Sequence, residues 1–276
     1  MDMKGKIILI TGATSGIGKE TAIGLAREGA TIVFTSRDRG RGLTARDEIA
    51  RLSGSKAVQF MMCDLASLES IRAFAKDFKK VYDRLDVLMN NAGVWDFKRR
   101  ESKDGIENIF ATNYLAPFLL TNLLLDLLKK SRPSRIVNVS SGLHRGTIHF
   151  DDIEFKRSFF STAAYSQSKL ALILFTRLLA EKLRGTGVTA NAVHPGFIST
   201  NLGRDAGLFF MYSFKLFGRN PKKGAETPIY LASSPDVEGI TGEYFHNCRV
   251  EKASCQSRDM DMAAKLWDLS VKYVGL

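Results

Sequence analysis

The stretch Lys6-Ile-Ile-Leu-Ile-Thr-Gly-Ala-Thr-Ser-Gly-Ile-Gly18 decides the fold of this chain. Its run from Ile7 to Ile10 is short, unbroken and mostly β-branched, which favours a strand buried on both faces of a parallel sheet. Glycines follow at once, so the backbone of the turn can approach a phosphate group closely. A helix beginning near Gly16 would aim its positive end at the same group. The stretch therefore predicts a strand, turn and helix that bind a dinucleotide pyrophosphate.

Two other interpretations of these glycines compete with this one. The spacing G-x-x-x-G-x-G differs from the common G-x-G-x-x-G pattern, so the glycines could serve the turn alone. A nucleotide-triphosphate loop is the second rival, because Lys19 follows Gly18 directly. That loop fails on detail, because five residues separate Gly12 from Gly18 where it needs four, and Glu20 stands where a magnesium-binding Ser or Thr is required.

Short apolar runs and helix-length segments alternate along the rest of the chain. This alternation predicts an α/β fold with a Rossmann-type, doubly wound parallel sheet in a three-layer α/β/α arrangement. A length of 276 residues suits a single domain, which we place at 1–276. Strands are expected at 7–10, 31–35, 57–62, 86–89, 135–139, 188–193 and near 243–245, and helices at 19–28, up to 52, 68–82, up to 128, 164–183, 225–232 and 259–273, with a variable segment at 203–220.

The composition is that of a soluble globular protein, with 45% hydrophobic and 25% charged residues. The formal charge of +11 is unusual. It admits nucleic-acid binding, contact with an anionic membrane, or a solvated basic surface that attracts a phosphorylated cofactor. We favour the last and expect no nucleic-acid partner, because the basic residues are scattered and no nucleic-acid recognition signature is present.

The cysteines and the apolar segments bear on location. Cys63, Cys248 and Cys255 lack Cys-x-x-Cys or zinc-like spacing, so we expect no metal and a reducing, cytoplasmic compartment. The chain reaches its first strand at once, which leaves no room for a signal peptide. The apolar helix Leu115–Leu128 is too short to span a bilayer, and we expect no transmembrane segment. Part of that helix could pack against a second subunit, so monomer and homodimer both stay open.

The end of the second strand indicates which cofactor binds. An acidic residue there would accept hydrogen bonds from the free ribose hydroxyl of NAD. Ser36 and Arg37 occupy this place, and a guanidinium can bind the 2′-phosphate of NADP. We therefore favour NADP(H) over NAD(H). The alternative is that Asp38, two residues further along, is the residue that meets the ribose, in which case an acid would be present.

Further polar residues follow the third and fourth strands. Asp64 follows one, and Asn90-Asn91-Ala92-Gly93 follows the other. The carboxyl ends of parallel strands are where ligands collect in such sheets. Turn chemistry alone would also favour these residue types, but their register with the glycine turn favours a binding role.

A second centre is Tyr165-Ser-Gln-Ser-Lys169. Residues four apart share one face of a helix, so the phenol and the ammonium can act near one ligand. Lowering the pKa of a tyrosine by about three units requires about 4 kcal/mol, which Lys169 and a positively charged nicotinamide could supply. Tyr165 would then exchange a proton with an alcohol or carbonyl. A helix-surface pair is the alternative.

The strand Val137-Asn138-Val139-Ser140-Ser141 supplies context for this pair, because a serine at its end can hydrogen-bond the substrate oxygen. An ordinary turn or helix-cap role is the alternative for these serines.

Taken together, these motifs resemble the short-chain dehydrogenase/reductase family, in the family's order and over nearly the whole chain. The resemblance implies that Ser141 polarises the substrate oxygen, Tyr165 is the acid/base, Lys169 lowers its pKa and holds the nicotinamide ribose, and Asn113 completes a water-linked proton relay. Thr200, after Pro195-Gly196, looks like a contact to the nicotinamide side. The cofactor-binding residues expected on these grounds are Gly12, Thr14, Ser15, Gly16, Ile17, Gly18, Ser36, Arg37, Asp64, Leu65, Asn91, Ala92, Gly93, Tyr165, Lys169, Pro195, Gly196 and Thr200.

Within the family the chain is most similar to the retinol dehydrogenase branch, with protochlorophyllide reductases as relatives. Phe118 through Leu128, His194-Pro195-Gly196 and Leu266-Trp267 carry this likeness. The branch implies NADP(H)-dependent interconversion of a lipophilic alcohol and its aldehyde or ketone. Its membrane-bound members carry an N-terminal anchor, whereas this sequence is expected to start at its first strand, so a retinoid substrate is not implied. A redox-sensing, nucleotide-binding protein without turnover is the alternative function.

The aromatic segment Leu208–Phe217 is expected near the substrate side of the site. It could line an apolar pocket, contact a membrane surface peripherally beside basic residues, or pack in the core. All three stay open.

Overall fold

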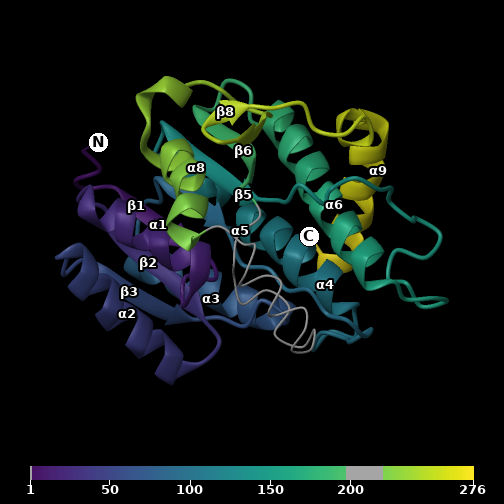
Figure 1. The fold of residues 1–276 in the computed structure, drawn as a ribbon, viewed down its shortest axis with the longest axis horizontal. Coiled ribbons are helices and arrows are strands. Elements are labelled where there is room, and N and C mark those ends of the chain that lie inside the picture. Colours follow the sequence, from purple (N-terminus) through teal and green to yellow (C-terminus); the bar gives the residue numbers. More distant parts are fainter. Residues whose placement is uncertain (1, 197–219) are drawn as a thin grey trace.

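A parallel sheet lies at the centre of the protein in a computed structural model that describes residues 2–196 and 220–276 (Figure 1). Among these residues the sheet has eight strands in the order β3-β2-β1-β4-β5-β6-β7-β8, and only the pair β7 and β8 is antiparallel. The chain winds outward from β1 in one direction and from β4 in the other. This confirms the predicted doubly wound, single-domain α/β fold. The strands are β1 (Ile7–Ile10), β2 (Thr31–Ser36), β3 (Val58–Met62), β4 (Val87–Asn90), β5 (Ser134–Val139), β6 (Val188–His194), β7 (Tyr244–His246) and β8 (Arg249–Val250).

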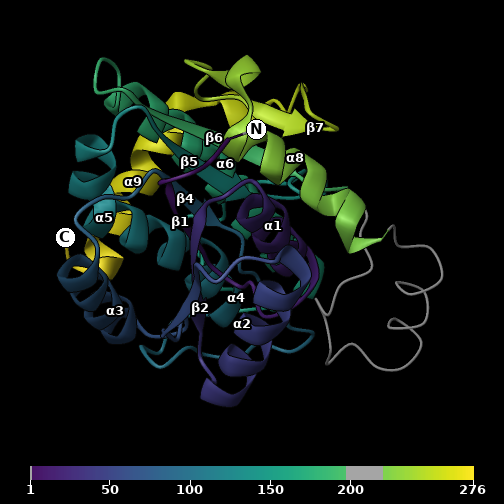
Figure 2. The same ribbon diagram turned by 90° about the vertical axis from the view of Figure 1, so that its left-hand side faces the viewer.

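Helices cover both faces of the sheet, because neighbouring residues of each strand point to opposite faces. In β1, Ile8 and Ile10 pack with α1, α2 and α8, whereas Leu9 packs with α3, α5, α6 and α9. Figure 2 shows these two layers on either side of the strands. The helices are α1 (Gly16–Arg27), α2 (Arg39–Ser53), α3 (Leu68–Val81), α4 (Asn108–Phe110), η1 (Ala111–Leu115), α5 (Ala116–Lys130), α6 (Ser161–Lys182), α8 (Pro221–Ser233), η2 (Pro235–Val237), η3 (Gln256–Arg258) and α9 (Met260–Val274).

A few boundaries differ from those expected. Helix α1 begins at Gly16, as expected for a pyrophosphate site and three residues before the segment 19–28. Helix α8 is longer than expected because it continues through Pro228. Strand β8 was not predicted. It has only two residues and follows a turn in which Asn247 and Cys248, neither of them glycine, have positive φ. The predicted variable segment at 203–220 lies outside the described residues, apart from Asn220.

The expectation that the Leu-rich helix is too short to cross a bilayer is wrong on length. Together α4, η1 and α5 form a helical run, Asn108–Lys130, of 23 residues with a mean hydropathy of 1.2 in its most apolar window. By length and composition it could span a membrane, but 78% of that window is buried inside the fold. The core role that we expected for this helix follows from its burial and not from its length.

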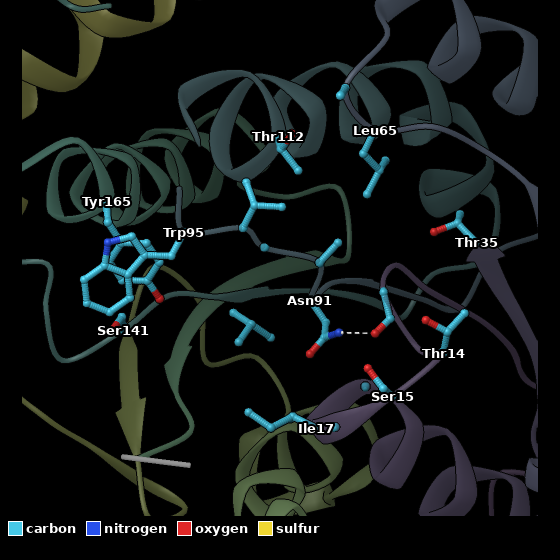
Figure 3. Close-up of a pocket in the computed structure, with 18 of the residues that line it drawn as sticks. Thr14, Ser15, Ile17, Thr35, Leu65, Asn91, Trp95, Thr112, Ser141 and Tyr165 are labelled. Atoms are coloured by element: carbon cyan, nitrogen blue, oxygen red, sulfur yellow. Dashed lines mark hydrogen bonds between the residues drawn. The ribbon is translucent and has the colours of Figure 1, made fainter. Parts of the chain in front are cut away.

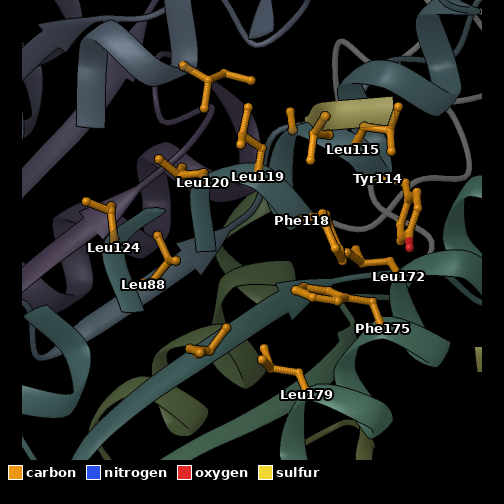
Figure 4. Packing of buried hydrophobic residues seen from close by; sticks show 14 of the residues in the cluster. Leu88, Tyr114, Leu115, Phe118, Leu119, Leu120, Leu124, Leu172, Phe175 and Leu179 are labelled. Atoms are coloured by element: carbon orange, nitrogen blue, oxygen red, sulfur yellow. The ribbon is translucent and has the colours of Figure 1, made fainter. Parts of the chain in front are cut away.

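The C-terminal helix α9 covers the outer side of α5 and α6. Its Trp267 packs edge-on against Phe118 of α5, with ring centroids 5.0 Å apart, and at 5.8 Å from Phe175 of α6. Figure 4 shows Phe118 and Phe175 meeting within the same apolar cluster. The apolar residues that extend beyond one face of α5 therefore have partners within the chain.

Candidate active site

One cavity of about 630 Å³ runs along the carboxyl ends of the parallel strands. Its volume lies in the range usual for small-molecule sites. It joins the glycine turn at one end to Tyr165 at the other, as Figure 3 shows. Of the residues predicted for the site, the cavity is lined by Gly12, Thr14, Ser15, Gly16, Ile17, Gly18, Ser36, Arg37, Asp64, Leu65, Asn91, Ala92, Gly93, Ser141, Tyr165, Lys169, Pro195 and Gly196.

The glycine turn packs tightly against the loop that follows β4. A Cβ on Gly12 would lie 2.7 Å from the Cα of Ala92, and one on Gly18 would lie 2.4 Å from Nδ2 of Asn91. The same Nδ2 donates hydrogen bonds to the carbonyl oxygens of Thr11, at 2.8 Å, and Gly12, at 3.1 Å. These two glycines are thus required by contact between two parts of the chain, a reason that sequence reasoning did not identify.

The first turn of α1 is open towards the cavity. Its N-cap residue Ser15 makes no side-chain capping hydrogen bond, and the turn contains no acidic residue. Ser15, Gly16 and Ile17 all line the cavity. Uncapped backbone N–H groups with the positive end of the helix dipole suit a pyrophosphate, so this part of the chain fits a dinucleotide cofactor.

The end of β2 supplies two arginines. Arg37 and Arg41 are exposed and line the cavity, and within the described part of the chain neither forms an ion pair with a carboxylate. The carboxylate of Asp38 is already engaged, because it caps α2 by accepting a hydrogen bond of 2.7 Å from the Arg41 amide. This end of the cavity therefore carries two exposed guanidinium groups.

Asp64 follows β3, lines the cavity and forms an ion pair with Lys103. Its carboxylate lies 3.0 Å from Lys103 Nζ and accepts a 3.1 Å hydrogen bond from the amide of Ala66. Burial would raise the pKa of Asp64, but the hydrogen bonds of Lys103 and Ala66 with the charges of Lys103 and Arg37 hold that pKa below its usual range. The side chain is thus a fixed negative charge near the arginine end.

At the opposite end the structure brings Ser141, Tyr165 and Lys169 together. Lys169 Nζ lies 5.6 Å from the centre of the Tyr165 ring and donates a 3.0 Å hydrogen bond to the carbonyl of Val139. The first serine of the pair, Ser140, is buried and donates to the Lys169 carbonyl. Only Ser141 lies beside Tyr165 and hydrogen-bonds with it. The structure thus brings the second serine, the tyrosine and the lysine to the same end of the cavity.

The expected lowering of the Tyr165 pKa included the charge of a bound nicotinamide, and the groups of this chain by themselves shift that pKa upwards. Burial raises the pKa of Tyr165 to about 12, and the hydrogen bond with Ser141 only partly offsets this. Burial also lowers the pKa of the Lys169 ammonium to about 8. Desolvation opposes both charged forms. The protein therefore holds Tyr165 as a protonated phenol, the form that donates a proton.

Trp95 is a site residue that sequence reasoning missed. Its indole stacks on the Tyr165 ring with centroids 4.5 Å apart and an angle of 15°, and it lines the cavity. Its Nε1 donates a 2.8 Å hydrogen bond to Ser161 Oγ, and Phe97 stacks on it at 5.8 Å. The available signal was a rare tryptophan two residues after the predicted loop Asn90–Gly93.

Asn113 lies behind the cavity wall. It is fully buried in η1, and its Oδ1 accepts a 2.7 Å hydrogen bond from the Val94 amide. Its Nδ2 donates to the Val94 carbonyl at 2.9 Å and to Ser168 Oγ at 3.1 Å, and Ser168 in turn donates to the Tyr165 carbonyl. The amide side chain thus links the loop after β4 to the helical turn that carries Tyr165. Thr200, the remaining predicted residue, lies outside the described residues.

No group of three histidine, cysteine or acidic side chains within 2–196 and 220–276 is arranged to hold a metal ion.

Comparison with known proteins agrees with this geometry. Residues 6–208 match the family model described as short chain dehydrogenase. The chain is 46% identical to human retinol dehydrogenase 14 and 42% identical to mouse retinol dehydrogenase 11. The alignments cover 99% and 100% of this chain and 88% of each relative.

Solved structures show the same fold. A crystal structure of an uncharacterised protein from Mycobacterium paratuberculosis has a TM-score of 0.82 at 33% identity, covering 99% of this chain and 95% of that one. The Pseudomonas aeruginosa RhlG/NADP active-site complex has a TM-score of 0.71 at 28% identity, covering 88% and 95%. The second of these similar structures is a complex with NADP.

Proposed function

This chain belongs to the short-chain dehydrogenase family and is similar to retinol dehydrogenases, and we propose that it is an NADP(H)-dependent enzyme that interconverts a lipophilic alcohol and its aldehyde or ketone. The observation that carries the proposal is the single cavity that joins the open start of α1 to the Tyr165 phenol. A cofactor with its phosphates at one end would present its reactive ring at the other. Retention of Ser141, Tyr165 and Lys169 around that end favours turnover over redox sensing alone.

The residues that would hold the cofactor are those with free donors or positive charge along the cavity. The first-turn amides of α1 would bind the pyrophosphate, and Arg37 and Arg41 would bind a 2′-phosphate. Lys169, buried beside Tyr165, would donate to the nicotinamide ribose. The bound nicotinamide supplies or accepts the hydride. The two arginines support NADP(H) over NAD(H), as does the use of the Asp38 carboxylate to cap α2.

The proton chemistry belongs to Ser141 and Tyr165. The Ser141 oxygen accepts a 3.1 Å hydrogen bond from the Leu143 amide, and its hydroxyl, which bonds with Tyr165, would donate its proton to a substrate oxygen bound between the two side chains. Tyr165, held as a phenol, donates the proton that a carbonyl oxygen gains on reduction.

Apolar and aromatic side chains near this end support a lipophilic substrate. Trp95 and Leu143 line the cavity, and Phe97 stacks behind Trp95. Leu143 and Phe160 expose 49% and 64% of their surfaces, which leaves apolar area beside the site. The named relatives, retinol dehydrogenases, act by name on a lipophilic alcohol.

A cytoplasmic location is also proposed. Its support is that Cys63, Cys248 and Cys255 are free thiols, as expected in a reducing compartment.

An NADPH-oxidation screen tests the proposed activity. Purified protein is incubated with aliphatic, aromatic and isoprenoid aldehydes and ketones, including retinal, with NADPH or NADH. We expect turnover that increases with substrate hydrophobicity and is faster with NADPH. Binding of NADPH without turnover of any carbonyl would instead favour the redox-sensing alternative.

A further inference from the structure

The peptide group between Ser141 and Gly142 is held on both sides by side chains that the proposed chemistry does not use. Its carbonyl oxygen accepts hydrogen bonds from Nδ1 of His144, at 2.7 Å, and from the hydroxyl of Tyr244, at 3.2 Å. Its N–H group donates a 2.9 Å hydrogen bond to Nδ1 of His194. Three side chains, one from the same loop and two from distant parts of the sequence, thus fix one peptide plane at the end of β5.

His194 is bound on several sides. Its Nδ1 also accepts a longer, 3.3 Å hydrogen bond from the amide of Gly196, in the loop after β6. Its ring stacks on His246 of β7 with centroids 4.6 Å apart and an angle of 17°, and Nδ1 of His246 donates to the His194 carbonyl at 3.0 Å. The imidazole therefore joins the loop that carries Ser141 to the loop that carries Pro195 and Gly196, and both loops line the cavity.

These hydrogen bonds define which nitrogen of the His194 imidazole carries the proton. An Nδ1 atom that accepts from two N–H groups carries a lone pair, so the proton of His194 is on Nε2. Burial, together with the nearby His246 and His144, lowers the pKa of His194 to about 4. The ring is thus a neutral acceptor at physiological pH, which the geometry requires.

Gly142 fits against this ring only because it has no side chain. A Cβ at Gly142 would lie 2.9 Å from Nε2 and 3.2 Å from Cε1 of His194. The backbone of Gly142 has no positive φ, so the obstacle to a side chain there is the imidazole and not the backbone. The His194 ring thus occupies the space that a side chain at position 142 would need.

The direction of the Ser141 hydroxyl depends on this backbone. Ser141 Oγ accepts from the amide of Leu143, two residues along the same loop, and the hydroxyl bonds with Tyr165. Rotation of the Ser141–Gly142 peptide would move the Leu143 amide and turn the hydroxyl away from the phenol. A displacement of about 1 Å at such a site can cost about 100-fold in rate.

We propose that His194 is a positioning residue, which through its Nδ1 acceptor fixes the Ser141–Gly142 peptide and so aims the Ser141 hydroxyl at the substrate oxygen. The inference rests on the proposed function, because it assigns Ser141 a role in turnover. His194 itself transfers no proton to the substrate.

Substitutions that keep or remove the acceptor test this proposal. In H194N the side-chain oxygen can stand where Nδ1 stands, whereas H194L fills similar space without an acceptor. We expect H194L to lower kcat by about 10-fold to 100-fold, and H194N to recover most of that loss. His149→Leu is the matched control, because His149 is exposed and does not line the cavity. Melting temperatures identify any variant that fails to fold.

A double-mutant cycle sharpens the test. Gly142→Ala forces a Cβ against Nε2 and Cε1, two atoms that asparagine lacks, so G142A should lower kcat by about 10-fold in the wild type and much less in H194N. Equal losses from G142A in both backgrounds, or H194N as slow as H194L, would overturn the proposal.

A measurement without turnover separates this proposal from the proposed function. Hydrogen exchange of the Gly142 amide, followed by NMR, should be faster in H194L than in the wild type and close to the wild type in H194N. A wild-type protein that turns over no carbonyl would reject the proposed function, and the exchange rates would still decide the role of His194. Equal protection in H194L and the wild type would contradict that role.

Discussion

Replacing Arg37 and Arg41 by alanine should convert the proposed preference for NADPH into indifference between the two cofactors. Both guanidinium groups line the arginine end of the cavity, and Asp38 cannot compensate because it caps α2. A charge-assisted hydrogen bond contributes about 1.5–3 kcal/mol when buried, and exposure of both side chains reduces this to about 1–1.5 kcal/mol each. Each single variant should therefore weaken NADPH binding about 5-fold to 10-fold.

The assay is a fluorescence titration of each variant with NADPH and with NADH. The Kd for NADH should change less than about twofold, because NADH lacks the 2′-phosphate. Arg39→Ala is the matched control, since Arg39 lies between the two in sequence and does not line the cavity. The loss for NADPH should shrink at high salt, because exposed charges are screened. Equal weakening for both cofactors, or no weakening, would refute the reasoning.

Three further outcomes are expected. Burial raises the pKa of Tyr165 to about 12 and lowers that of Lys169 to about 8. The rate of carbonyl reduction should therefore stay level from about pH 6 to pH 8 and fall above pH 8 as the ammonium is lost. A rate that rises from about pH 6 to pH 8 would contradict the phenol as proton donor. Gly18→Ala should lower the free energy of unfolding, measured in urea, by about 1–3 kcal/mol, because its Cβ would lie 2.4 Å from Nδ2 of Asn91. Gly146→Ala is the control. Its Cβ would have its nearest contact at 3.8 Å, so the free energy of unfolding should change little. Leu266→Ala should cost about 2–5 kcal/mol by the same measurement, because Leu266 is 1% exposed where α9 covers the core, and a loss under about 1 kcal/mol would show that α9 contributes little.

Most of the site could be predicted because its residues follow parallel strands. The carboxyl ends of such strands meet at one edge, so residues after β1, β2, β4 and β5 gather there whatever their distance in sequence. Arg37, Asn91 and Ser141 are of this kind, and all three line the cavity. The helical spacing of Tyr165 and Lys169 adds the remaining pair by local geometry alone.

The parts that could not be predicted depend on contacts between distant segments. The stack of Trp95 on Tyr165 requires the loop after β4 to meet α6, and no local pattern specifies that meeting. The role of Asn113 in a proton relay stays a prediction, and the sequence did not indicate that its side-chain amide joins Val94 to Ser168. A motif identifies which residues occur, but not which of their atoms are already engaged.

The direction of the Tyr165 pKa shift shows the same limit. The sequence places a lysine one turn from the tyrosine, which argues for a lowered pKa. How deeply both groups are buried is a tertiary property, and here burial prevails and raises the pKa to about 12. The phenol rather than the phenolate is therefore the form that this chain itself favours.

The measurement that tests the central claim most directly is single-turnover reduction of a carbonyl substrate by Tyr165→Phe with NADPH bound. The ring and its stack on Trp95 are kept, so the NADPH Kd should stay within about twofold of the wild type, while the rate of hydride transfer falls by about 10²–10⁴. Tyr230→Phe, whose ring does not line the cavity, is the matched control. A Tyr165→Phe enzyme that reduces the carbonyl at the wild-type rate would contradict the account.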